Sequence, residues 1–462
     1  MASTFLTRTV SGSDSTYTYK RNTVSVWLKR SGLGNACFFE GWYSNAFATQ
    51  VYFLSSGELV LNAASSTAGS AFQIQTNRKF RDTSAWYHIV ISIDTTDATS
   101  TDRCKIYVNG VRETSFSSAS YPNQNASVQW SGTGNTQFVG RRESGGAGLY
   151  YDGAMSYLAY IDGTAELPTI FGETDTTTGQ WKIKTDITPS VAWGNFGFLI
   201  LKNGNSLTDE STNTNNFTLG SGTLTNTLDC PSNVFATLNS LLTGSYASLS
   251  NGNNTLTGTS SANNAHRPAT LQVGTSGKYY YEVKITANEN GVGFEYPVDG
   301  VVPNSEAIQQ GDGNGAAGFY PKLFFACNGR IERSNLGTGL ADLTGLTVIG
   351  STGIKMFAID MDNGAIYIGA NGAWLNNGSA IGVPSSGSSK TGAMWGFNPS
   401  DYPNIAICSS AYDAAVSNYN FGNGYFGTSA VTSAGTAGST PGVFEYDVPS
   451  GYEPLTTKGL NA

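Results

Sequence analysis

Two stretches of this sequence, CKIYVNGVRE at residues 104–113 and AIYIGANGAW at residues 365–374, share one pattern. In each, alternating apolar residues run into an Asn-Gly pair, and a second short segment of strand type follows. Alternation with a period of two is typical of a β-strand that buries one face, and Asn-Gly is the strongest short signal for a two-residue hairpin turn. The sequence therefore predicts the same β-hairpin in both halves of the chain.

The residues before the first hairpin add further strands. WYHIVISID, residues 86–94, places Tyr87 and three isoleucines on one face and polar residues, including His88, on the other. The polar run at 95–103 then connects this strand to the hairpin. Further strand patterns are TVSVWLKR, ACFFEGWY, ELVLNAA and NTQFVGRR. Short alternating strands at such regular spacing predict an antiparallel β-sandwich.

The second half of the chain has the same character. KYYYEVKIT, residues 278–286, alternates in the same way, with Tyr279 and Tyr281 on one face and Glu282 on the other. GIKMFAIDMDNGAIYIGANGAW, residues 353–374, contains two Asn-Gly pairs. Two such turns in succession predict a three-stranded meander.

Each end of the chain thus carries its own strands and its own hairpin, which predicts one sandwich over residues 1–171 and another over residues 244–462. Residues 172–243 between them are rich in Thr, Asn and Gly and have the pattern of a connector. Apolar residues such as Trp181 are out of place in a solvated linker, so we expect the connector to dock and to be partly ordered. VFATLNSLL, residues 234–242, suggests a short helix.

Composition limits the classes of function. Hydrophobic residues make up 39% of the 462 residues and charged residues only 13%, while 56 glycines suit many tight turns. The net charge of -8 and the lack of a basic cluster argue against nucleic-acid binding. The N-terminal MASTFLTRTVSGSDS lacks the apolar core of a signal peptide, and no 18 consecutive residues are apolar. We therefore expect a soluble protein that is not exported by that route and not inserted in a membrane.

The cysteines give no sign of a zinc site or a redox pair. They are odd in number and never occur in the C-x-x-C spacing that such sites need. Cys104 alternates with Ile106 and Val108, which indicates a buried thiol that packs as a small apolar group. The five are Cys37, Cys104, Cys230, Cys327 and Cys408.

Longer stretches resemble known proteins. TVSVWLKRSGLG, the segment from SAWYHIVISIDTT to CKIYVNGVRE, and YYDGAMSYLAYIDGTAELPTIFGETD resemble laminin-G-like, concanavalin-A-like sandwiches of bacteriophage virion proteins. TNTNNFTL and LDCPSNVFATLN look like the connector that follows such domains in marine phage proteins. KYYYEVKI, FAIDMDNGAIYIGANGAW, YNFGNGYF and PSGYEPL resemble a SPRY-like domain. The resemblance implies an all-β fold of two concanavalin-A-like jelly-roll β-sandwiches joined by a partly ordered connector.

The same resemblance implies a place in a virion. The function that it favours is that of a phage surface protein, a tail fibre or appendage, assembled in the host cytoplasm and binding a host-surface glycan or receptor. The expected partners are other virion proteins, that glycan or receptor, and further copies of the chain as a homo-oligomer. Alternatives are a capsid decoration or head-fibre protein with a structural role and, third, a polysaccharide hydrolase.

The residues favour binding over catalysis. Concanavalin-A-like glycoside hydrolases need acids spaced along a strand, and the nearest pattern here has Glu173 and Asp175 but Thr178 where a third acid belongs. His88 and His266 are the only histidines, which leaves little for a histidine-based triad or metal site. We therefore expect no enzyme.

No cofactor is expected either. Asp360 and Asp362 in DMDNG resemble the start of a calcium loop, but the glycine comes one position early and no glutamate follows at position 12. A hairpin turn explains this run. Calcium at a sandwich edge stays an open alternative, with no ligands identified in the sequence.

Aromatic residues near predicted turns are the candidates for ligand binding. A flat ring can stack on the apolar face of a sugar, while amide groups bond to its hydroxyls. On this reasoning the ligand-binding candidates are Trp374, Asn371, Trp395 and Tyr402. The alternative for each aromatic residue is a place in the core.

Overall fold

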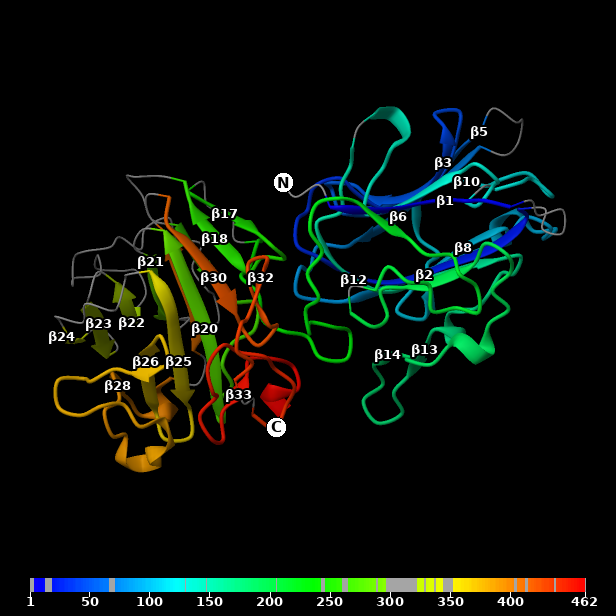
Figure 1. Ribbon diagram of the computed structural model, residues 1–462. Helices are drawn as coiled ribbons and strands as arrows, with labels where there is room; N and C mark the ends of the chain where they lie inside the picture. The colour runs from blue at the N-terminus through cyan, green and yellow to red at the C-terminus, as the bar shows by residue number, and fades with distance from the viewer. Residues whose placement is uncertain are drawn as a thin grey trace. The chain divides into compact units, whose positions relative to one another are not determined.

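In the computed structural model the chain divides into two compact units, Met1–Asn226 and Thr227–Ala462. Each unit packs two antiparallel β-sheets face to face (Figure 1). The prediction of an all-β chain with two sandwiches is therefore confirmed. Among the residues described, the only helices are short 3-10 turns, and none is long and apolar enough to cross a membrane.

The structure describes residues 4–461, apart from 13–18, 66–70, 129, 147, 205, 242–245, 260–264, 288–289, 296–321, 328–329, 336–337, 344–351, 403–404, 412–413 and 436–437. The side chains of His266 and Cys327 also lie outside the described part.

The first sandwich pairs an eight-stranded sheet, in the order β10-β6-β5-β4-β3-β11-β1-β16, with a six-stranded sheet, in the order β15-β12-β2-β7-β8-β9. The strands of the first sheet are β1 (Phe5–Thr9), β3 (Ala36–Ser44), β4 (Phe47–Phe53), β5 (Glu58–Ser65), β6 (Phe72–Lys79), β10 (Phe116–Ser120), β11 (Thr136–Val139) and β16 (Thr218–Ser221). Those of the second are β2 (Arg21–Arg30), β7 (Tyr87–Asp94), β8 (Cys104–Val108), β9 (Val111–Arg112), β12 (Gly153–Asp162) and β15 (Phe198–Ile200). A separate hairpin joins β13 (Gly172–Thr174) to β14 (Trp181–Ile183).

The second sandwich has one sheet in the order β17-β18-β30-β20-β25-β26-β27 with β28 and β33 attached, and another in the order β19-β29-β21-β22-β23-β24. The first contains β17 (Ala247–Ser250), β18 (Thr255–Gly258), β20 (Lys278–Ala287), β25 (Gly353–Asp360), β26 (Ala365–Ala370), β27 (Ala373–Trp374), β28 (Trp395–Gly396), β30 (Val416–Asn420) and β33 (Glu453–Pro454). The second contains β19 (Ala265–Pro268), β21 (Asn290–Glu295), β22 (Lys322–Cys327), β23 (Arg330–Asn335), β24 (Thr338–Leu343) and β29 (Ala406–Ala411). A short hairpin of β31 (Tyr425–Phe426) and β32 (Ser429–Ala430) stands apart.

The two sandwiches share one strand topology. In the first, the central order β6-β5-β4-β3-β11-β1 faces β12-β2-β7-β8-β9; in the second, β24-β23-β22-β21-β29-β19 faces β30-β20-β25-β26-β27. Both series follow the same chain order, so each strand of one series has an equivalent in the other. The chain is thus built from the same arrangement of strands twice.

The two Asn-Gly hairpins occupy equivalent places, between β8 and β9 and between β26 and β27. Asn109 and Gly110 have φ angles of 48° and 80°, and Asn371 and Gly372 have 49° and 88°. Positive φ at both positions is the signature of a type I′ turn, which confirms the predicted turns. In each turn the Asn side-chain oxygen accepts the backbone N–H of the facing strand residue, from His88 at 2.8 Å and from Ile354 at 2.9 Å.

Each sandwich has an ion pair between equivalent strands, β2 and β7 in the first and β20 and β25 in the second. Arg21 opens β2 and faces Asp94 at the end of β7, with Nε and Oδ2 3.0 Å apart. Lys278 opens β20 and faces Asp360 at the end of β25, with Nζ and Oδ2 3.1 Å apart. In both cases the aspartate also accepts hydrogen bonds from the turn that follows it.

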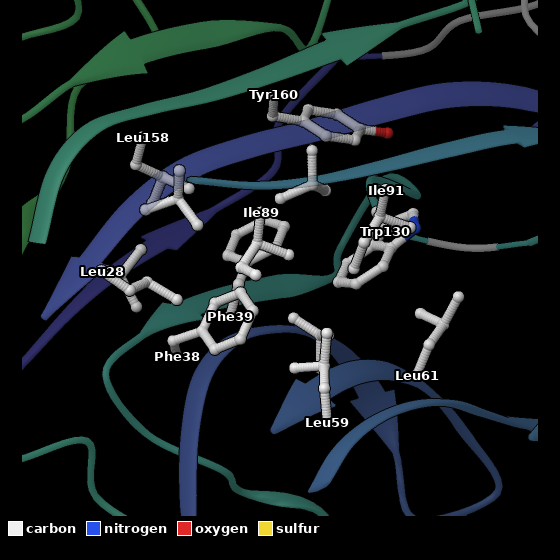
Figure 2. Close-up of a cluster of buried hydrophobic side chains, with 14 of the residues drawn as sticks. Leu28, Phe38, Phe39, Leu59, Leu61, Ile89, Ile91, Trp130, Leu158 and Tyr160 are labelled. Atoms are coloured by element: carbon white, nitrogen blue, oxygen red, sulfur yellow. The ribbon is translucent and has the colours of Figure 1, made fainter. Parts of the chain in front are cut away.

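A large apolar core fills the space between the sheets of each sandwich. Figure 2 shows side chains of the first core, among them Leu28 and Ile91 from one sheet and Leu59 from the other, pointing into one interior. A smaller cluster packs on the outer face of one sheet in each unit. In the first, Phe171, Ile187 and Trp193 cover β7, β8 and β12. In the second, Phe444, Val448 and Tyr452 cover β20, β25 and β26.

The expected connector, residues 172–243, divides between the two units. Its first part belongs to the first unit, where β15 and β16 join the two sheets of the sandwich and β13 and β14 form the separate hairpin. Its last part belongs to the second, where Phe235 bridges to Thr456 and Leu238 bridges to Ala269 in extended conformation. The short helix predicted at 234–242 is therefore wrong over its described residues, because the apolar side chains reach the core by pairing with other strands instead of lying on one helical face.

Candidate functional site

A hollow of about 480 Å³ lies at one end of β26 in the second sandwich. Its walls come from two segments that are far apart in the sequence. One is the turn at 361–364 that joins β25 to β26, and the other is the long loop between β27 and β29. The residues that line it are Asn363, Lys390, Gly396, Phe397, Asn398, Pro399, Asp401 and Tyr402.

The turn at 361–364 is held by its own polar groups. Asp360 is fully buried and accepts hydrogen bonds from the backbone N–H and the side-chain amide of Asn363, at 2.9 and 2.8 Å. The N–H of Gly364 bonds to the carbonyl of Asp360 at 2.8 Å, and Gly364 has a φ of 72°. The turn has four residues between the paired Asp360 and Ala365, longer than the two-residue turn that the Asn363-Gly364 pair suggests. This fixes the Asn363 side chain at the rim of the hollow.

The long loop is folded against the turn by backbone contacts. Phe397 donates its N–H to the carbonyl of Gly364 at 2.9 Å, and the Lys390 ammonium donates to the carbonyl of Phe397 at 2.9 Å. A 3-10 turn, η7 (Pro399–Asp401), follows Asn398, whose side-chain amide lies 3.3 Å from Oδ1 of Asp401. The loop therefore presents a cation, a carboxylate and an amide around one opening.

The floor of the hollow is aromatic and buried. The rings of Phe397 and Tyr402 meet edge to face, with centroids 5.6 Å apart and planes at 89°, and Trp395 packs behind both. Exposed fractions are 5% for Phe397, 2% for Tyr402 and 1% for Trp395. Such rings shape the hollow and exclude water from beneath it, but they offer no open face for stacking.

Polar groups at the rim remain available for a ligand. Within the described residues, Oδ1 of Asn363, Oδ1 of Asn398 and Oδ2 of Asp401 accept no hydrogen bond, and the Lys390 ammonium uses one of its three protons. These groups include both donors and acceptors, which is what a vicinal pair of sugar hydroxyls requires.

The four ligand-binding candidates predicted from the sequence do not lie at one site in the structure. Trp395 pairs with Ile366 and lies near the hollow with Tyr402. Asn371 and Trp374 lie at the opposite end of β26, a strand of six residues and about 20 Å. The side-chain oxygen of Asn371 is already used within its own turn.

The burial of the two tryptophans differs. Trp395 is almost fully buried, which favours its alternative place in the core, whereas Trp374 is partly exposed and packs on the outer cluster. Tyr402 lines the hollow from beneath with little exposed surface. Of the four predicted residues, Tyr402 is the one that contributes to this site.

Sequence reasoning missed Lys390, Asn398 and Asp401. Lys390 is the single charged residue in a run of Ser and Gly, and it has a positive φ of 49°. Asn398-Pro399 and Asp401 form a turn signal after the strand at Trp395. The sequence could have indicated this part of the site through a polar turn that follows a lone lysine. No pattern in the sequence shows that Asn363 lies beside these residues.

At the equivalent place in the first sandwich, an arginine links two loops. There the loop between β7 and β8 holds Arg103, whose guanidinium donates to the carbonyls of Asp97, Ala98 and Pro122 at 2.9, 3.0 and 3.0 Å. Pro122 lies in the loop between β10 and β11, within the stretch from β9 to β11 that is equivalent to the stretch from β27 to β29 in the second sandwich. One arginine thus ties together the two segments that flank the hollow in the other copy.

The acids considered for hydrolysis lie elsewhere, on the β13–β14 hairpin. Lys182 lies 3.3 Å from both Glu173 and Asp175. Backbone N–H groups of Thr178 and Thr177, together with Lys182, lower the pKa of Asp175 to about 2. The hydroxyl and N–H of Thr178 bond to Asp175, so this residue closes a turn.

His88 lies in the interior of the first unit, with an exposed fraction of 1%. Its ring stacks on Trp27, and it forms hydrogen bonds with Ser25 and with the indole N–H of Trp181. His266 belongs to β19, where its backbone pairs with Ser410.

The described residues contain no group of three or more His, Cys, Asp or Glu side chains that could hold a metal ion. Asp360 is bound to Lys278 and Asn363, and Asp362 accepts the N–H of Gly277 at 2.7 Å. The run DMDNG therefore serves as a turn. Among the cysteines whose side chains are described, Cys37, Cys104 and Cys408 are buried, and burial raises the pKa of the thiols of Cys37 and Cys104.

Comparison with known proteins gives several distant structural resemblances and one family match. No curated protein matches the sequence. Similar solved structures include a heptameric SAP-like pentraxin from Limulus polyphemus, with 20% identity over 35% of this chain and 77% of that chain and a TM-score of 0.24. The PSpry domain of TRIM65 has 12% identity over 40% and 88%, with a TM-score of 0.28. Domains LG4-5 of the mouse laminin alpha1 chain have 9% identity over 90% and 85%, with a TM-score of 0.30.

A family model matches the sequence directly over residues 7–182, which span most of the strands of the first sandwich. That family is the concanavalin A-like lectin/glucanases superfamily. The first sandwich of this chain therefore has a concanavalin A-like, laminin-G-type lectin fold.

Proposed function

We propose that this protein is a phage virion surface protein, a tail fibre or appendage, that binds a host-surface glycan in the hollow of the second sandwich and does not turn it over. The observation that carries the glycan site is the set of free donors and acceptors around Lys390, Asn398 and Asp401. The lectin-type family match of residues 7–182 supports a saccharide as the class of ligand. The virion part of the proposal rests on the sequence resemblance alone.

The ligand is held by hydrogen bonds. Asp401 and the two asparagines accept from hydroxyls, and Lys390 donates to a hydroxyl or ring oxygen. A bond between neutral groups contributes about 0.5–1.5 kcal/mol net, and one to the charged Asp401 or Lys390 contributes about 1.5–3 kcal/mol. The two rings that line the hollow, Phe397 and Tyr402, are buried and add no stacking. A single site therefore binds weakly, and several copies on one particle reach useful avidity together.

The test is binding of the purified protein to an array of bacterial surface polysaccharides. Asp401→Ala removes a charged acceptor and should weaken binding of the recognised glycan about 10- to 100-fold. Asp186→Ala, which removes an exposed acid on the first unit, is the matched control and should bind like the parent chain. Equal binding by the Asp401 and Asp186 variants would remove the hollow from the proposal.

Two further measurements test the other parts. Immunogold labelling of phage particles should mark tails or appendages; label spread over heads would favour the decoration alternative. Incubation of the recognised polysaccharide with the protein should release no reducing ends. Steady release would show that it is an enzyme.

A further inference from the structure

A row of polar side chains crosses the outer face of the eight-stranded sheet in the first sandwich. Glu40, Gln50, Asn62 and Gln73 face one another directly on four adjacent strands, β3, β4, β5 and β6. Their neighbours along each strand, such as Val51, point into the core. Alternation along a strand therefore places the whole row on the side away from the core.

Hydrogen bonds run along this row in one direction. The Ser144 hydroxyl donates to Oε1 of Gln50 at 3.2 Å, and Nε2 of Gln50 donates to Oδ1 of Asn62 at 3.0 Å. Nδ2 of Asn62 lies 3.4 Å from Oε1 of Gln73. Gln50 is buried, while Asn62 and Gln73 are partly exposed. The bonds fix the amides in place, and each amide keeps capacity for a further partner.

The loop that follows β11 packs at one end of the row. Glu40 is fully buried, and its carboxylate accepts the backbone N–H groups of Glu143 and Ser144. These bonds hold the segment after β11 down on the sheet. Burial raises the pKa of the Glu40 carboxyl, while the two N–H bonds and the nearby charge of Arg142 oppose this rise. Losing either N–H bond would leave a buried acceptor unsatisfied, so the two bonds fix the position of the loop.

Arg142, in the same loop, has hydrogen-bond donors that remain unused. The Arg142 guanidinium lies over the ring of Tyr52, 5.5 Å from its centroid, and its Nε donates to the carbonyl of Ser144 at 2.9 Å. Within the part of the chain that is described, its two terminal nitrogens bond to no acceptor. Tyr52 follows Gln50 by two residues on β4, so the arginine and the amide row share one face at a spacing of about 7 Å.

We propose that this face of the first sandwich is a second binding site, and that its ligand is an acidic saccharide. The planar fork of Arg142 matches a carboxylate. The amides of Asn62 and Gln73 both donate and accept, as sugar hydroxyls do. A carboxylate and hydroxyls a few ångströms apart occur together on a uronic acid residue, whereas an acidic peptide lacks the hydroxyls.

Isothermal titration calorimetry of the full chain with trigalacturonic acid tests this site. The neutral control ligand is its methyl ester, which keeps the shape and loses the charge. The acid should bind the parent protein, and the ester should bind about 10- to 100-fold more weakly. Arg142→Gln should produce a similar loss, and Arg142→Lys should restore only part of the affinity, because an ammonium lacks the fork.

Arg112→Gln, which removes an exposed arginine paired with Asp102, is the matched control and should bind trigalacturonate like the parent. Asn62→Ala should weaken the acid and the ester alike, and unchanged melting temperatures should show that the variants are folded. The idea fails if the ester binds as well as the acid, if triglutamate binds as well as trigalacturonate, or if trigalacturonate does not bind. Asp401→Ala in the second sandwich should retain trigalacturonate binding, so failure at one site is distinguishable from failure at the other.

Discussion

Acidification should destabilise the first sandwich through His88. Its ring stacks on the indole of Trp27, with centroids 4.7 Å apart, and lies beside the indole of Trp181, with centroids 6.0 Å apart. The indole N–H of Trp181 donates to Nδ1 at 2.9 Å, so the ring proton is on Nε2, which is 2.9 Å from the Ser25 hydroxyl. Protonation of Nδ1 would break the Trp181 bond and place a charge where almost no water reaches it. Burial accordingly lowers the pKa of His88 to about 3.

The size of the effect follows from linkage. The pKa falls from 6.5 in the unfolded chain to about 3 in the folded one. The unfolded state therefore binds the proton first, and stability is complete above pH 6.5 and decreases as the pH falls toward 3. Each unit of pKa difference corresponds to 1.36 kcal/mol, so the loss is about 2 kcal/mol at pH 5 and about 4 kcal/mol at pH 3, where the folded-state ring is itself half protonated.

Urea unfolding between pH 7.5 and pH 4, followed by tryptophan fluorescence, measures this loss. The comparison is with His88→Gln, which does not titrate but whose amide can accept from Trp181 and donate to Ser25. The carboxylates contribute equally to both proteins, so the difference between their pH profiles reports His88. If the two free energies of unfolding change in parallel from pH 7 to pH 4.5, the ring is not held neutral by its surroundings and the reasoning is refuted.

Three further predictions concern stability. Burial raises the pKa of Glu282 to about 6 from 4.5, so the second sandwich should gain about 2 kcal/mol as the pH falls from 7.5 to 4.5, and Glu282→Gln should abolish this gain in urea titrations. Gly110→Ala should lower the free energy of unfolding by at least about 2 kcal/mol, because the φ of Gly110 is 80° and a Cβ there would lie 2.5 Å from the Trp181 ring. Gly34→Ala is the control, since open space surrounds Gly34. Trp395→Ala should lower the free energy of unfolding by about 3–5 kcal/mol because it removes a buried ring, and Trp374→Ala should lower it less because Trp374 is partly exposed. Equal melting temperatures for the two variants would contradict the burial of Trp395.

The hairpins could be predicted because their cause is local. An Asn-Gly pair fixes the backbone of a turn, so the residues at 109–110 and 371–372 determine their own conformation. The failed helix at 234–242 marks the limit of this reasoning. Its apolar residues have helical spacing by chance, and tertiary pairing of Phe235 and Leu238 decides their conformation.

The candidate site depends on contacts that no local pattern encodes. Asn363 meets Lys390 and Asp401 only because β28 pairs with β26 and returns the long loop to the turn. Trp395 is near a predicted turn, which made it a candidate for stacking on a ligand, but in the structure it pairs with Ile366 and its ring is buried. The aromatic residues were visible in the sequence, whereas the direction in which each one points is a property of the sheet.

The outer covering of one sheet in each sandwich determines where the chain can be cut. A fragment ending at residue 171 would lack Ile187 and Trp193, and the outward side chains of Val90 and Ile161 would face water. It would also lose β15 and β16, an edge strand of each sheet. A fragment ending at residue 226 keeps all of these residues and strands. The shortest fragment that should fold as a lectin-type module therefore extends well beyond β12, the last long strand of the sandwich. It has to include the segment that covers the outer face of the sheet.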